Sequence, residues 1–286
     1  MAALIASGAA SARALGSSEL IVTAEDFTGK VVLVTGGTRG IGVAIAEAFA
    51  TRGAAVVVCG RSEPADLPAG VSFVKADVRE PAHAAAVVDA AAQRGGRIDI
   101  VVNNAGGTAP APAATLAPDR AAAIVTLNLL APFYVAQSAN AIMQRQASGG
   151  VIVNIGSIAE LRPAPGVALY AGAKGGLRAL TRALALEWGP KVRVNIVTPG
   201  IVRTDGSARH YGGEAPFAAA EQTIPRRRAA APSDVAAACL LIASPLAAHV
   251  SGAELRVDGG GETPGWMIAV EHALGADAGS GDGADG

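Results

Sequence analysis

Runs of aliphatic side chains alternate along this chain with longer segments whose apolar residues recur at helical spacing. The aliphatic runs are β-branched and end in glycine or polar turns, which is typical of strands buried on both faces of a sheet. With the turns and loops that follow them, we expect strands over residues 31–35, 54–59, 73–80, 98–107, 149–160, 191–200 and 253–261. Strands that alternate with helices predict a doubly wound α/β domain with a parallel sheet.

The helical pattern is clearest in five segments rich in alanine and leucine. They are residues 43–53, 81–96, 126–139, 170–189 and 235–244. Pro81 suits the first turn of its helix, and Ser233 is expected to cap the last one. No linker interrupts residues 27–262, so we expect one domain there. Residues 1–26 form a poorly ordered extension in this interpretation, and residues 263–286 form a tail that is disordered from about 273.

Composition narrows the classes of partner. Hydrophobic residues make up 51% of the chain and aromatic residues 3%, so the core must be aliphatic. The net charge of −1 argues against a nucleic acid or an anionic membrane as partner. No apolar run reaches the roughly 18 residues that a transmembrane helix needs. Cys59 and Cys239 lack metal-ligand spacing, which predicts buried thiols in a reducing, cytoplasmic compartment and no metal site.

A glycine-rich turn follows the first predicted strand and opens the first predicted helix. It reads TGGTRGIG over residues 35–42, with Gly36, Gly40 and Gly42 at its fixed positions. Glycines allow a tight turn and a close backbone approach, and the new helix presents free N–H groups to a phosphate. A strand, a glycine turn, a helix and a second strand in this order predict a dinucleotide site.

The end of the second strand bears on the choice of dinucleotide. An acidic residue there would accept hydrogen bonds from a ribose 2′-hydroxyl, but position 60 is glycine. Arg61 follows, and Arg39 lies in the glycine turn. Two guanidinium groups near one ribose suit a 2′-phosphate, which favours NADP(H). A solvated Arg61 and the use of NAD(H) remain the alternative.

Candidate acid–base chemistry lies in the segment from Ser157 to Lys174. Ser157 follows the fifth strand, where ligands bind in open parallel sheets, and Tyr170 and Lys174 are one helical turn apart. An ammonium beside a phenol favours the phenolate, so we expect Lys174 to lower the pKa of Tyr170. Asn128 lies in an apolar helical stretch, where a buried amide needs hydrogen-bond partners. A surface tyrosine and lysine, and a purely structural Asn128, are the alternatives for these residues taken singly.

In their order, these motifs resemble those of the short-chain dehydrogenase/reductase family. The resemblance covers residues 27–262 and includes TGxxxGxG, Asp77-Val78, the NNAG of residues 103–106, Asn128, Ser157, YxxxK and the PGxxxT of residues 199–204. It implies a single Rossmann domain with seven parallel strands and helices on both faces. It also implies cofactor contacts from two loops and their neighbours: Gly36, Thr38, Arg39, Gly40, Ile41, Gly42, Arg61, Asp77, Val78, Asn104, Ala105, Gly106, Tyr170, Lys174, Pro199, Gly200, Ile201, Val202 and Thr204.

The resemblance further implies a reaction, which is hydride transfer between a nicotinamide and a carbonyl or alcohol carbon. Tyr170 would exchange the proton, Lys174 would favour its phenolate and bind the nicotinamide ribose, and Ser157 would donate to the developing oxyanion. Asn128 would kink its helix and support a water in the proton relay. Alternatives on the same residues are a silent NADP(H)-binding sensor or structural protein, an epimerase and a dehalogenase.

The substrate is the least determined part of the prediction. Residues 205–235 have weak periodicity and occupy the place of the family's substrate lid, where His210, Tyr211 and Phe217 are candidate contacts or packing residues. Few charges precede Arg226, so we expect an apolar small-molecule carbonyl or alcohol: fatty-acyl, steroid, terpenoid or polyketide, with a lean towards 3-oxoacyl carrier-protein reductases. By resemblance, the assembly is a homotetramer or a homodimer.

Overall fold

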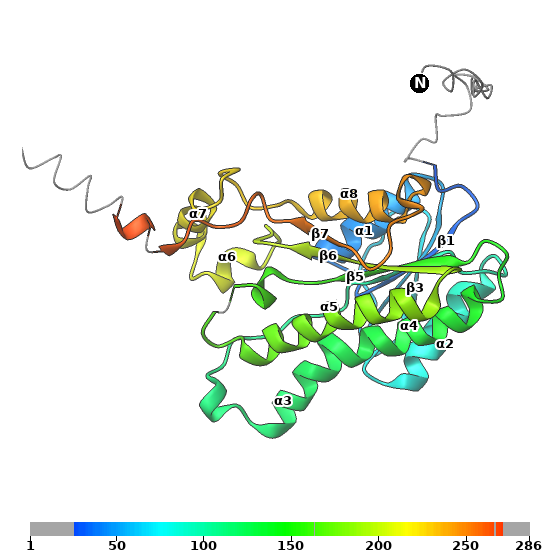
Figure 1. Ribbon diagram of the computed structural model, residues 1–286, viewed down its shortest axis with the longest axis horizontal. Helices are drawn as coiled ribbons and strands as arrows, with labels where there is room; N and C mark the ends of the chain where they lie inside the picture. Colours follow the sequence, from blue (N-terminus) through cyan, green and yellow to red (C-terminus); the bar gives the residue numbers. More distant parts are fainter. Residues whose placement is uncertain (1–25, 163, 266, 271–286) are drawn as a thin grey trace, which may run out of the picture.

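Seven parallel strands form the centre of this computed structural model, which describes residues 26–162, 164–265 and 267–270 (Figure 1). The strands lie in the order β3-β2-β1-β4-β5-β6-β7. Their bounds are β1 Val31–Thr35, β2 Ala55–Gly60, β3 Val71–Lys75, β4 Ile100–Asn103, β5 Gly150–Ile155, β6 Val192–Pro199 and β7 Glu254–Val257. The order changes direction between β1 and β4, so the carboxyl ends of these two strands border a crevice in which ligands bind. The predicted doubly wound, seven-stranded parallel sheet is confirmed.

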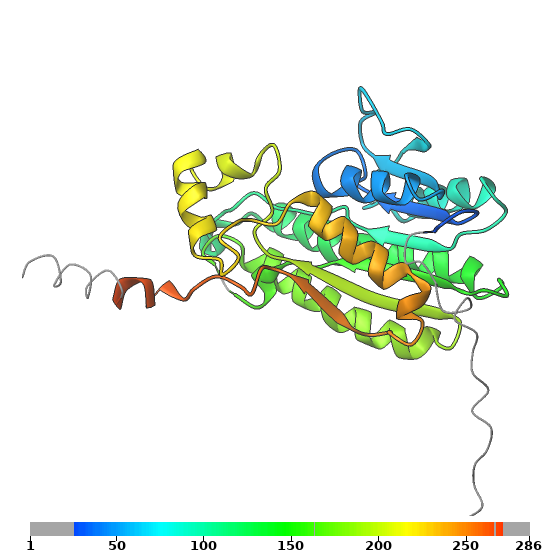
Figure 2. The same ribbon diagram turned by 90° about the horizontal axis from the view of Figure 1, so that it is seen from above.

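Helices cover both faces of this sheet. Helices α1 (Gly40–Ala50) and α8 (Pro232–Ala243) contact each other on one face, and Figure 2 shows them crossing it side by side. Helices α2 (Pro81–Gln93), α4 (Ala131–Met143) and α5 (Ala168–Trp188) cover the other face. The short helices α6 (Ser207–His210) and α7 (Glu214–Gln222) lie beyond the end of the sheet. The remaining elements are α3 (Pro118–Val125) and the short turns η1 (Ala113–Thr115), η2 (Thr126–Leu130), η3 (Ile158–Glu160) and η4 (Pro245–Ala247).

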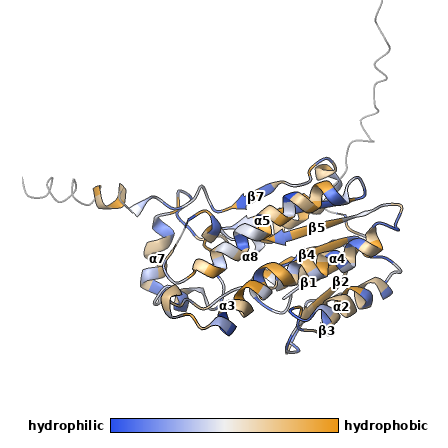
Figure 3. Ribbon diagram, turned by 60° about the horizontal axis from the view of Figure 1, so that its bottom comes forward, coloured by the Kyte–Doolittle hydropathy of each residue, from blue (hydrophilic) through white to orange (hydrophobic). Residues whose placement is uncertain are grey.

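The core is aliphatic, as the composition predicts, and it forms one cluster on each side of the sheet. Every residue of β1 and β4 is buried, and Figure 3 colours these two strands mainly as hydrophobic. Ile45 and Phe49 of α1 fill one cluster, and Val135 and Met143 of α4 fill the other. Continuous β-branched strands are the pattern that burial on both faces requires.

Several boundaries differ from the predicted ones for a common reason. Strands β4 and β5 end at Asn103 and Ile155, so residues 104–107 and 156–160 belong to the loops that follow. These loops carry candidate site residues at the carboxyl edge of the sheet. Helix α1 begins at Gly40 rather than at residue 43, because the glycine turn closes directly into the helix.

The predicted cap of the last helix is wrong. Helix α8 begins at Pro232 with Ala231 as its N-cap, so Ser233 already lies inside the first turn. The carboxylate of Asp234 accepts a hydrogen bond from the Ala231 backbone N–H at 2.8 Å instead. Proline at the first helical position fixes this start, because its ring presets a helical φ and its missing N–H would be unpaired there anyway.

One long apolar helix corrects the sequence interpretation. Helix α3, η2 and α4 join into a continuous segment, Pro118–Met143, of 26 residues with a hydropathy of 1.4, which is long and apolar enough to cross a membrane. Residues Ala131, Val135 and Ala139 of this segment are nevertheless buried against the sheet. Isolated polar residues interrupt the apolar run in the sequence, and only the continuous helix reveals the segment's full length. The α4 part of the segment therefore packs inward, as a helix that covers a Rossmann sheet does, whereas no residue of α3 is buried.

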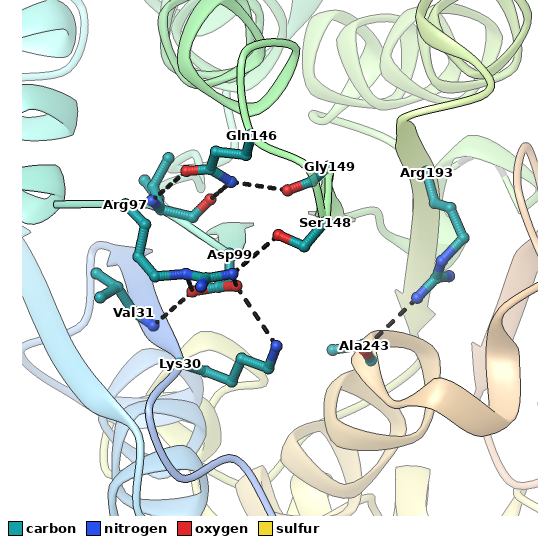
Figure 4. Close-up of polar contacts among 10 residues, drawn as sticks. Lys30, Val31, Arg97, Asp99, Gln146, Ser148, Gly149, Arg193 and Ala243 are labelled. Carbon is teal, nitrogen blue, oxygen red and sulfur yellow. Dashed lines mark hydrogen bonds and ion pairs between the residues drawn. The ribbon is translucent and has the colours of Figure 1, made fainter. Parts of the chain in front are cut away.

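A polar clamp closes the amino-terminal edge of the sheet, opposite the crevice (Figure 4). Asp99 accepts a hydrogen bond from the Val31 backbone N–H at 3.0 Å and two from Arg97, and Lys30 lies 3.6 Å from it. Arg97 also donates to Ser148 at 2.8 Å. The clamp joins the starts of β1 and β4 to the loop before β5, which supports the fold rather than the site.

A second polar network lies inside the core. Asn103 of β4 donates to Asn154 of β5 at 2.9 Å, and Asn154 donates to Thr181 of α5 at the same distance. Thr181 in turn donates to the Leu177 carbonyl at 2.8 Å. Asn103, Asn154 and Thr181 are all buried, so each must be paired within the protein. The network ties the helix that carries Tyr170 and Lys174 to the two central strands.

Replacing Thr181 by valine tests this network. The change keeps the shape of the side chain and leaves the Asn154 amide without its acceptor, so we expect a loss of about 1–3 kcal/mol in the free energy of unfolding. Chemical denaturation measures the loss. Thr51→Val is the matched control, because the Thr51 hydroxyl is exposed and bonds to two carbonyls of the adjacent helix and to the neighbouring Arg52. Equal losses in both variants would contradict a special role for the buried network.

Candidate active site

The glycine turn is held open by contacts that exclude side chains. Gly36 and Gly40 have φ values of 62° and 53°, in the left-handed region that favours glycine. A Cβ atom on Gly42 would collide with the carbonyl oxygen of Gly36. Thr204 lies against Gly40, since its Cγ2 would be 3.5 Å from a Cβ there. The predicted PGxxxT loop and the glycine turn are therefore neighbours in space.

Asn104 fixes the glycine turn to the end of β4. Its side chain donates to the carbonyls of Thr35 and Gly36, both at 3.0 Å. The Thr35 hydroxyl accepts hydrogen bonds from the backbone N–H groups of Asn104 and Ala105. Sequence reasoning missed Thr35, although its place immediately before the glycine turn was a usable signal. The carboxyl ends of β1 and β4 are thus locked together beneath the turn.

The start of α1 fits a dinucleotide phosphate. Its N-cap, Arg39, makes no side-chain capping bond, and no acidic residue lies in the first turn. The first N–H groups of the helix therefore remain available to an anion, with the positive end of the helix dipole behind them. Together with the cradle that only glycine at position 42 permits, these features fit the diphosphate of NAD(P)(H).

A basic hollow lies beside this turn. Its volume is about 420 Å³, and it is lined by Arg61, Lys75, Ala76, Asp77 and His83. Gly60 contacts Thr38 closely, because a Cβ on Gly60 would lie 3.2 Å from the Thr38 Cγ2. Of the two predicted residues there, Arg61 lines the hollow and Arg39 remains exposed at the glycine turn.

Asp77, the expected adenine contact, already has a strong partner. Arg79 donates to both carboxylate oxygens, with its Nε 2.9 Å from one and 3.1 Å from the other. This hydrogen-bonded pair holds the pKa of the Asp77 carboxyl below its usual value, with smaller contributions from charges that include Arg61. Val78 is buried beside it. Arg79 was not singled out from the sequence, since a charged residue after a strand is usually solvated.

Ser157, Tyr170 and Lys174 come together at the carboxyl edge of β5. The Ser157 hydroxyl hydrogen-bonds with Tyr170 and lowers its pKa, and it accepts the Ala159 backbone N–H at 3.2 Å. The Nζ atom of Lys174 lies 5.9 Å from the centre of the Tyr170 ring and donates to the Ile155 carbonyl at 2.7 Å. The three side chains that the sequence places in one segment therefore share one site.

The expected direction of the Tyr170 pKa is wrong for the protein without ligand. Burial is the largest influence and raises the pKa of Tyr170, the Ser157 hydrogen bond lowers it, and the charge of Glu160 raises it. Lys174 is itself only 3% exposed, and burial lowers the pKa of its ammonium to about 8. Spacing along a helix reveals which groups are neighbours, but not how much water each of them loses.

Asn128 occupies a π-helical turn, η2, between α3 and α4. Its amide donates to the carbonyls of Ile124 and Gly107 at 2.9 and 3.0 Å, and its Oδ1 accepts the Gly107 N–H at 2.9 Å. A wider helical turn of this kind marks the predicted distortion of the helix. A Cβ on Gly106 would contact both the Asn128 Oδ1 and the Lys174 Nζ, so the NNAG loop passes between them.

A small apolar cavity of about 10 Å³ lies beside Tyr170. Its lining comes from the loop after β4, from α3 and from the start of α5: Thr108, Ala109, Ala111, Ala113, Leu116, Ile124, Gly166, Val167, Ala168, Leu169 and Tyr170. The backbone hydrogen bond from Ala111 to the Gly166 carbonyl, at 2.9 Å, joins the two loops. No charged side chain lines this cavity.

The lid residues behave differently from one another. Phe217 is fully buried beneath Tyr211 and the guanidinium of Arg203, so it packs the lid instead of facing a substrate. Tyr211 is 38% exposed, and His210 lies edge-on to it. Pro199, Gly200, Ile201 and Val202 lead from β6 towards this lid, and Val202 forms a β-bridge with Ala230.

The structure also describes the two cysteines, the potential metal ligands and part of the C-terminal segment. Cys59 and Cys239 are buried, and burial raises the pKa of each thiol to about 12. Among the described residues, no group of three or more His, Cys, Asp or Glu side chains is placed to hold a metal ion. Of the predicted extension and tail, residues 1–25, 266 and 271–286 lie outside the described residues. Thr263 bonds to the Thr223 carbonyl, so contact with the domain continues past residue 262.

Comparisons with known proteins agree with this geometry. A family model described as enoyl-(acyl carrier protein) reductase matches residues 36–262. The chain belongs to the short-chain dehydrogenase/reductase family. Members named in the comparisons are dehydrogenases and reductases, and the chain is accordingly an NAD(P)-dependent oxidoreductase.

Three similar proteins illustrate the range of activities named among the matches. The chain is 41% identical over 241 residues to a protein named as ketoacyl reductase 2 of the granaticin polyketide synthase of Streptomyces violaceoruber, covering 80% of this chain and 95% of that one. It is 38% identical to the 3alpha-hydroxysteroid dehydrogenase of Mediterraneibacter gnavus, covering 80% and 96%. The ligand-free aldohexose dehydrogenase of Thermoplasma acidophilum superposes with a TM-score of 0.77 at 29% identity, covering 83% and 94%.

Replacing Gly42 by alanine tests the cradle. The added methyl group would collide with the Gly36 carbonyl, so the turn must open, and we expect at least a tenfold loss of NADPH affinity, or about 1.4 kcal/mol. Fluorescence titration of bound NADPH measures it. Gly172→Ala on the exposed side of α5 is the control, because a methyl group there meets nothing within 4 Å. Unchanged affinity in Gly42→Ala would contradict the assigned phosphate site.

Proposed function

We propose that the protein transfers a hydride between NADP(H) and the carbonyl or secondary alcohol carbon of an apolar small molecule, with Tyr170 as the acid–base group. The observation that carries the proposal is the convergence of Ser157, Tyr170 and Lys174 beside an apolar cavity at the carboxyl edge of the sheet. The same edge carries the glycine turn that fits a dinucleotide phosphate.

The proposed roles follow from the contacts. The nicotinamide, when bound, supplies or accepts the hydride. Tyr170 donates its phenolic proton to the oxygen that gains charge during reduction, and removes a proton from the alcohol during oxidation. Ser157, already hydrogen-bonded to Tyr170, is in place to donate to the same developing oxyanion. The ammonium of Lys174 stabilises the phenolate that proton donation leaves behind.

The cofactor contacts that we propose come from the glycine turn, from the loop after β4 and from the segment at the end of β6. The glycine turn, with Thr38 and Ile41, would hold the diphosphate, and Asn104, Ala105 and Gly106 would line the cofactor. Pro199, Gly200, Ile201, Val202 and Thr204 would face the nicotinamide end. Asn128 would keep its proposed role in the proton relay by fixing the Gly107 backbone and the helix beside Lys174.

The substrate proposal is a 3-oxoacyl, polyketide or steroid carbonyl. Support comes from the cavity beside Tyr170, in which every lining side chain except Thr108 and Tyr170 is apolar or a glycine. The names of the granaticin and hydroxysteroid relatives point to the same classes. The lining comes mainly from residues 108–124 and 166–170, so these loops contribute to substrate choice alongside the lid.

Assembly as a homotetramer or homodimer, and a cytoplasmic location, also stay predictions. The outer faces of the helices leave Leu186 and Leu241 exposed by 87% and 47%. A second copy that covered these side chains would remove apolar surface from water.

Tyr170→Phe tests the catalytic assignment. Removing only the hydroxyl leaves the ring packing in place, so we expect turnover to fall by roughly 10³-fold while NADPH still binds. The measurement is NADPH oxidation with a panel of carbonyl substrates, paired with NADPH binding. Tyr134→Phe, on the neighbouring helix α4, controls for the loss of a hydroxyl elsewhere. Turnover like that of the wild type in Tyr170→Phe would sink the assignment, and absence of redox turnover in the wild type would favour a silent binding protein.

Arg61→Ser tests the cofactor preference. If Arg61 pairs with a 2′-phosphate, its loss should raise the KM for NADPH about tenfold and leave the KM for NADH nearly unchanged. Arg94→Ser, at the exposed end of α2, is the control for a lost surface charge. Parallel changes for both dinucleotides, or a wild type that prefers NADH, would contradict NADP(H) use.

A further inference from the structure

Glu160 is a buried carboxylate without a hydrogen-bonded partner. It ends η3, the turn for which Ser157 is the N-cap, and its backbone N–H donates to the Ser157 carbonyl at 3.2 Å. Its side chain is 0% exposed. Neither carboxylate oxygen accepts a hydrogen bond from a described residue, and Arg178 makes an ion-pair contact at 3.4 Å. A buried charge is costly, so its retention here calls for an explanation.

The position of Glu160 relates it to the catalytic helix. Tyr170, Lys174 and Arg178 follow one another at intervals of four residues, so they share one face of α5. The Cβ of Glu160 lies 4.0 Å from the point where a side chain on Gly175 would begin. Glu160 therefore lies next to the turn of α5 that follows Lys174.

The charged groups around Glu160 come from two elements. Helix α5 contributes Lys174 and Arg178, and β7 contributes Glu254 and Arg256. Arg178 also lies 3.7 Å from Glu254, which in turn lies 3.4 Å from Arg256. Burial, the largest influence, raises the pKa of Glu160 to about 7, Arg178 lowers it, and Glu254 raises it further.

We propose that Glu160 is a positioning residue that holds the protons on Lys174 and Tyr170 and so maintains the site in the form that reduces carbonyls. This inference rests on the proposed hydride transfer. Within the described part of the chain, Glu160 is the carboxylate whose charge raises the pKa of both Lys174 and Tyr170. An anion near two proton-binding groups stabilises their protonated forms, and the low dielectric of the interior strengthens the effect.

The sign of the pH dependence follows. Carbonyl reduction needs the proton on Tyr170, so its rate falls at high pH as that proton is lost. Above about pH 7 the Glu160 carboxylate is mainly ionised, and its charge moves the loss of the Tyr170 proton to higher pH. Below about pH 6 it is mainly protonated, so removing its charge should change little there. The effect of Glu160 should therefore appear only on the basic limb of the profile.

Glu160→Gln is the decisive variant, since it removes the charge and keeps the volume. We expect the basic limb of kcat/KM for carbonyl reduction with NADPH to move down by roughly one pH unit. At pH values above the basic limb, the kcat/KM of the variant should be about tenfold lower than that of the wild type. Near pH 6 the two values should agree. Glu160→Ala serves as a second charge-removing variant, and Glu160→Asp should keep the wild-type limb because it keeps the charge.

Glu254→Gln is the matched control. It removes a carboxylate that borders the same Arg178, and Glu160, not Glu254, is the carboxylate whose charge raises the pKa of Lys174 and Tyr170. Its basic limb should stay where the wild type has it. An unmoved limb in Glu160→Gln, or an equal shift in Glu254→Gln, would overturn the proposal.

A titration without turnover separates this inference from the proposed function. The near-ultraviolet absorbance of phenolate is recorded against pH, and the Tyr170→Phe curve is subtracted to isolate Tyr170 from the other two tyrosines. Tyr170 should ionise at lower pH in Glu160→Gln than in the wild type. If no carbonyl substrate turns over, the proposed function fails while this titration still decides the role of Glu160. Identical titration curves would refute that role.

Discussion

A buried ammonium group sets the conditions for the site. Lys174 has lost almost all contact with water, and its hydrogen bond goes to the Ile155 carbonyl at the end of β5. Burial makes the charged form of an amine expensive, so its pKa falls to about 8, close to the range in which the site must work. Its ammonium donates to the carbonyl at the end of β5, and the charge of Glu160 opposes the effect of burial by raising its pKa.

Two kinds of contact hold the segments around Lys174 in place. They are close approaches of the backbone at glycines and hydrogen bonds between buried polar groups. Gly36, Gly42 and Gly106 admit neighbours that any side chain would displace. Asn104 and Thr35 then bind the resulting turn to β4. Deeper in the core, Asn154 and Thr181 join helix α5 to the sheet. Protein interiors are close-packed and transmit strain, so the packing of these elements determines the distances between the side chains of the site.

Local patterns predicted the parts of the fold that depend on short-range chemistry. The β-branched runs identified all seven strands, since strands buried on both faces need such runs. The strand ends were less accurate, because the NNAG and Ser157 segments continue the apolar run while leaving the sheet. Ser233 failed as a cap because Pro232 starts the helix two positions earlier than a Ser233 cap would, and the Asp234 carboxylate accepts the Ala231 N–H. Phe217 was a candidate substrate contact because nothing in the sequence reveals that Arg203 and Tyr211 enclose it.

The sequence by itself determined which residue types are present and at what spacing, and so it indicated the glycine turn, the Tyr170–Lys174 pair and the reaction class. Only the tertiary structure decided the environment of those groups. The pKa of Tyr170 is raised where the helical spacing suggested a lowering, and Glu160 stands beside the site although it belongs to no motif. The physical reason is that spacing along a helix fixes which side chains share a face. Desolvation and long-range charge depend on every element packed around them, and those elements come from distant parts of the chain.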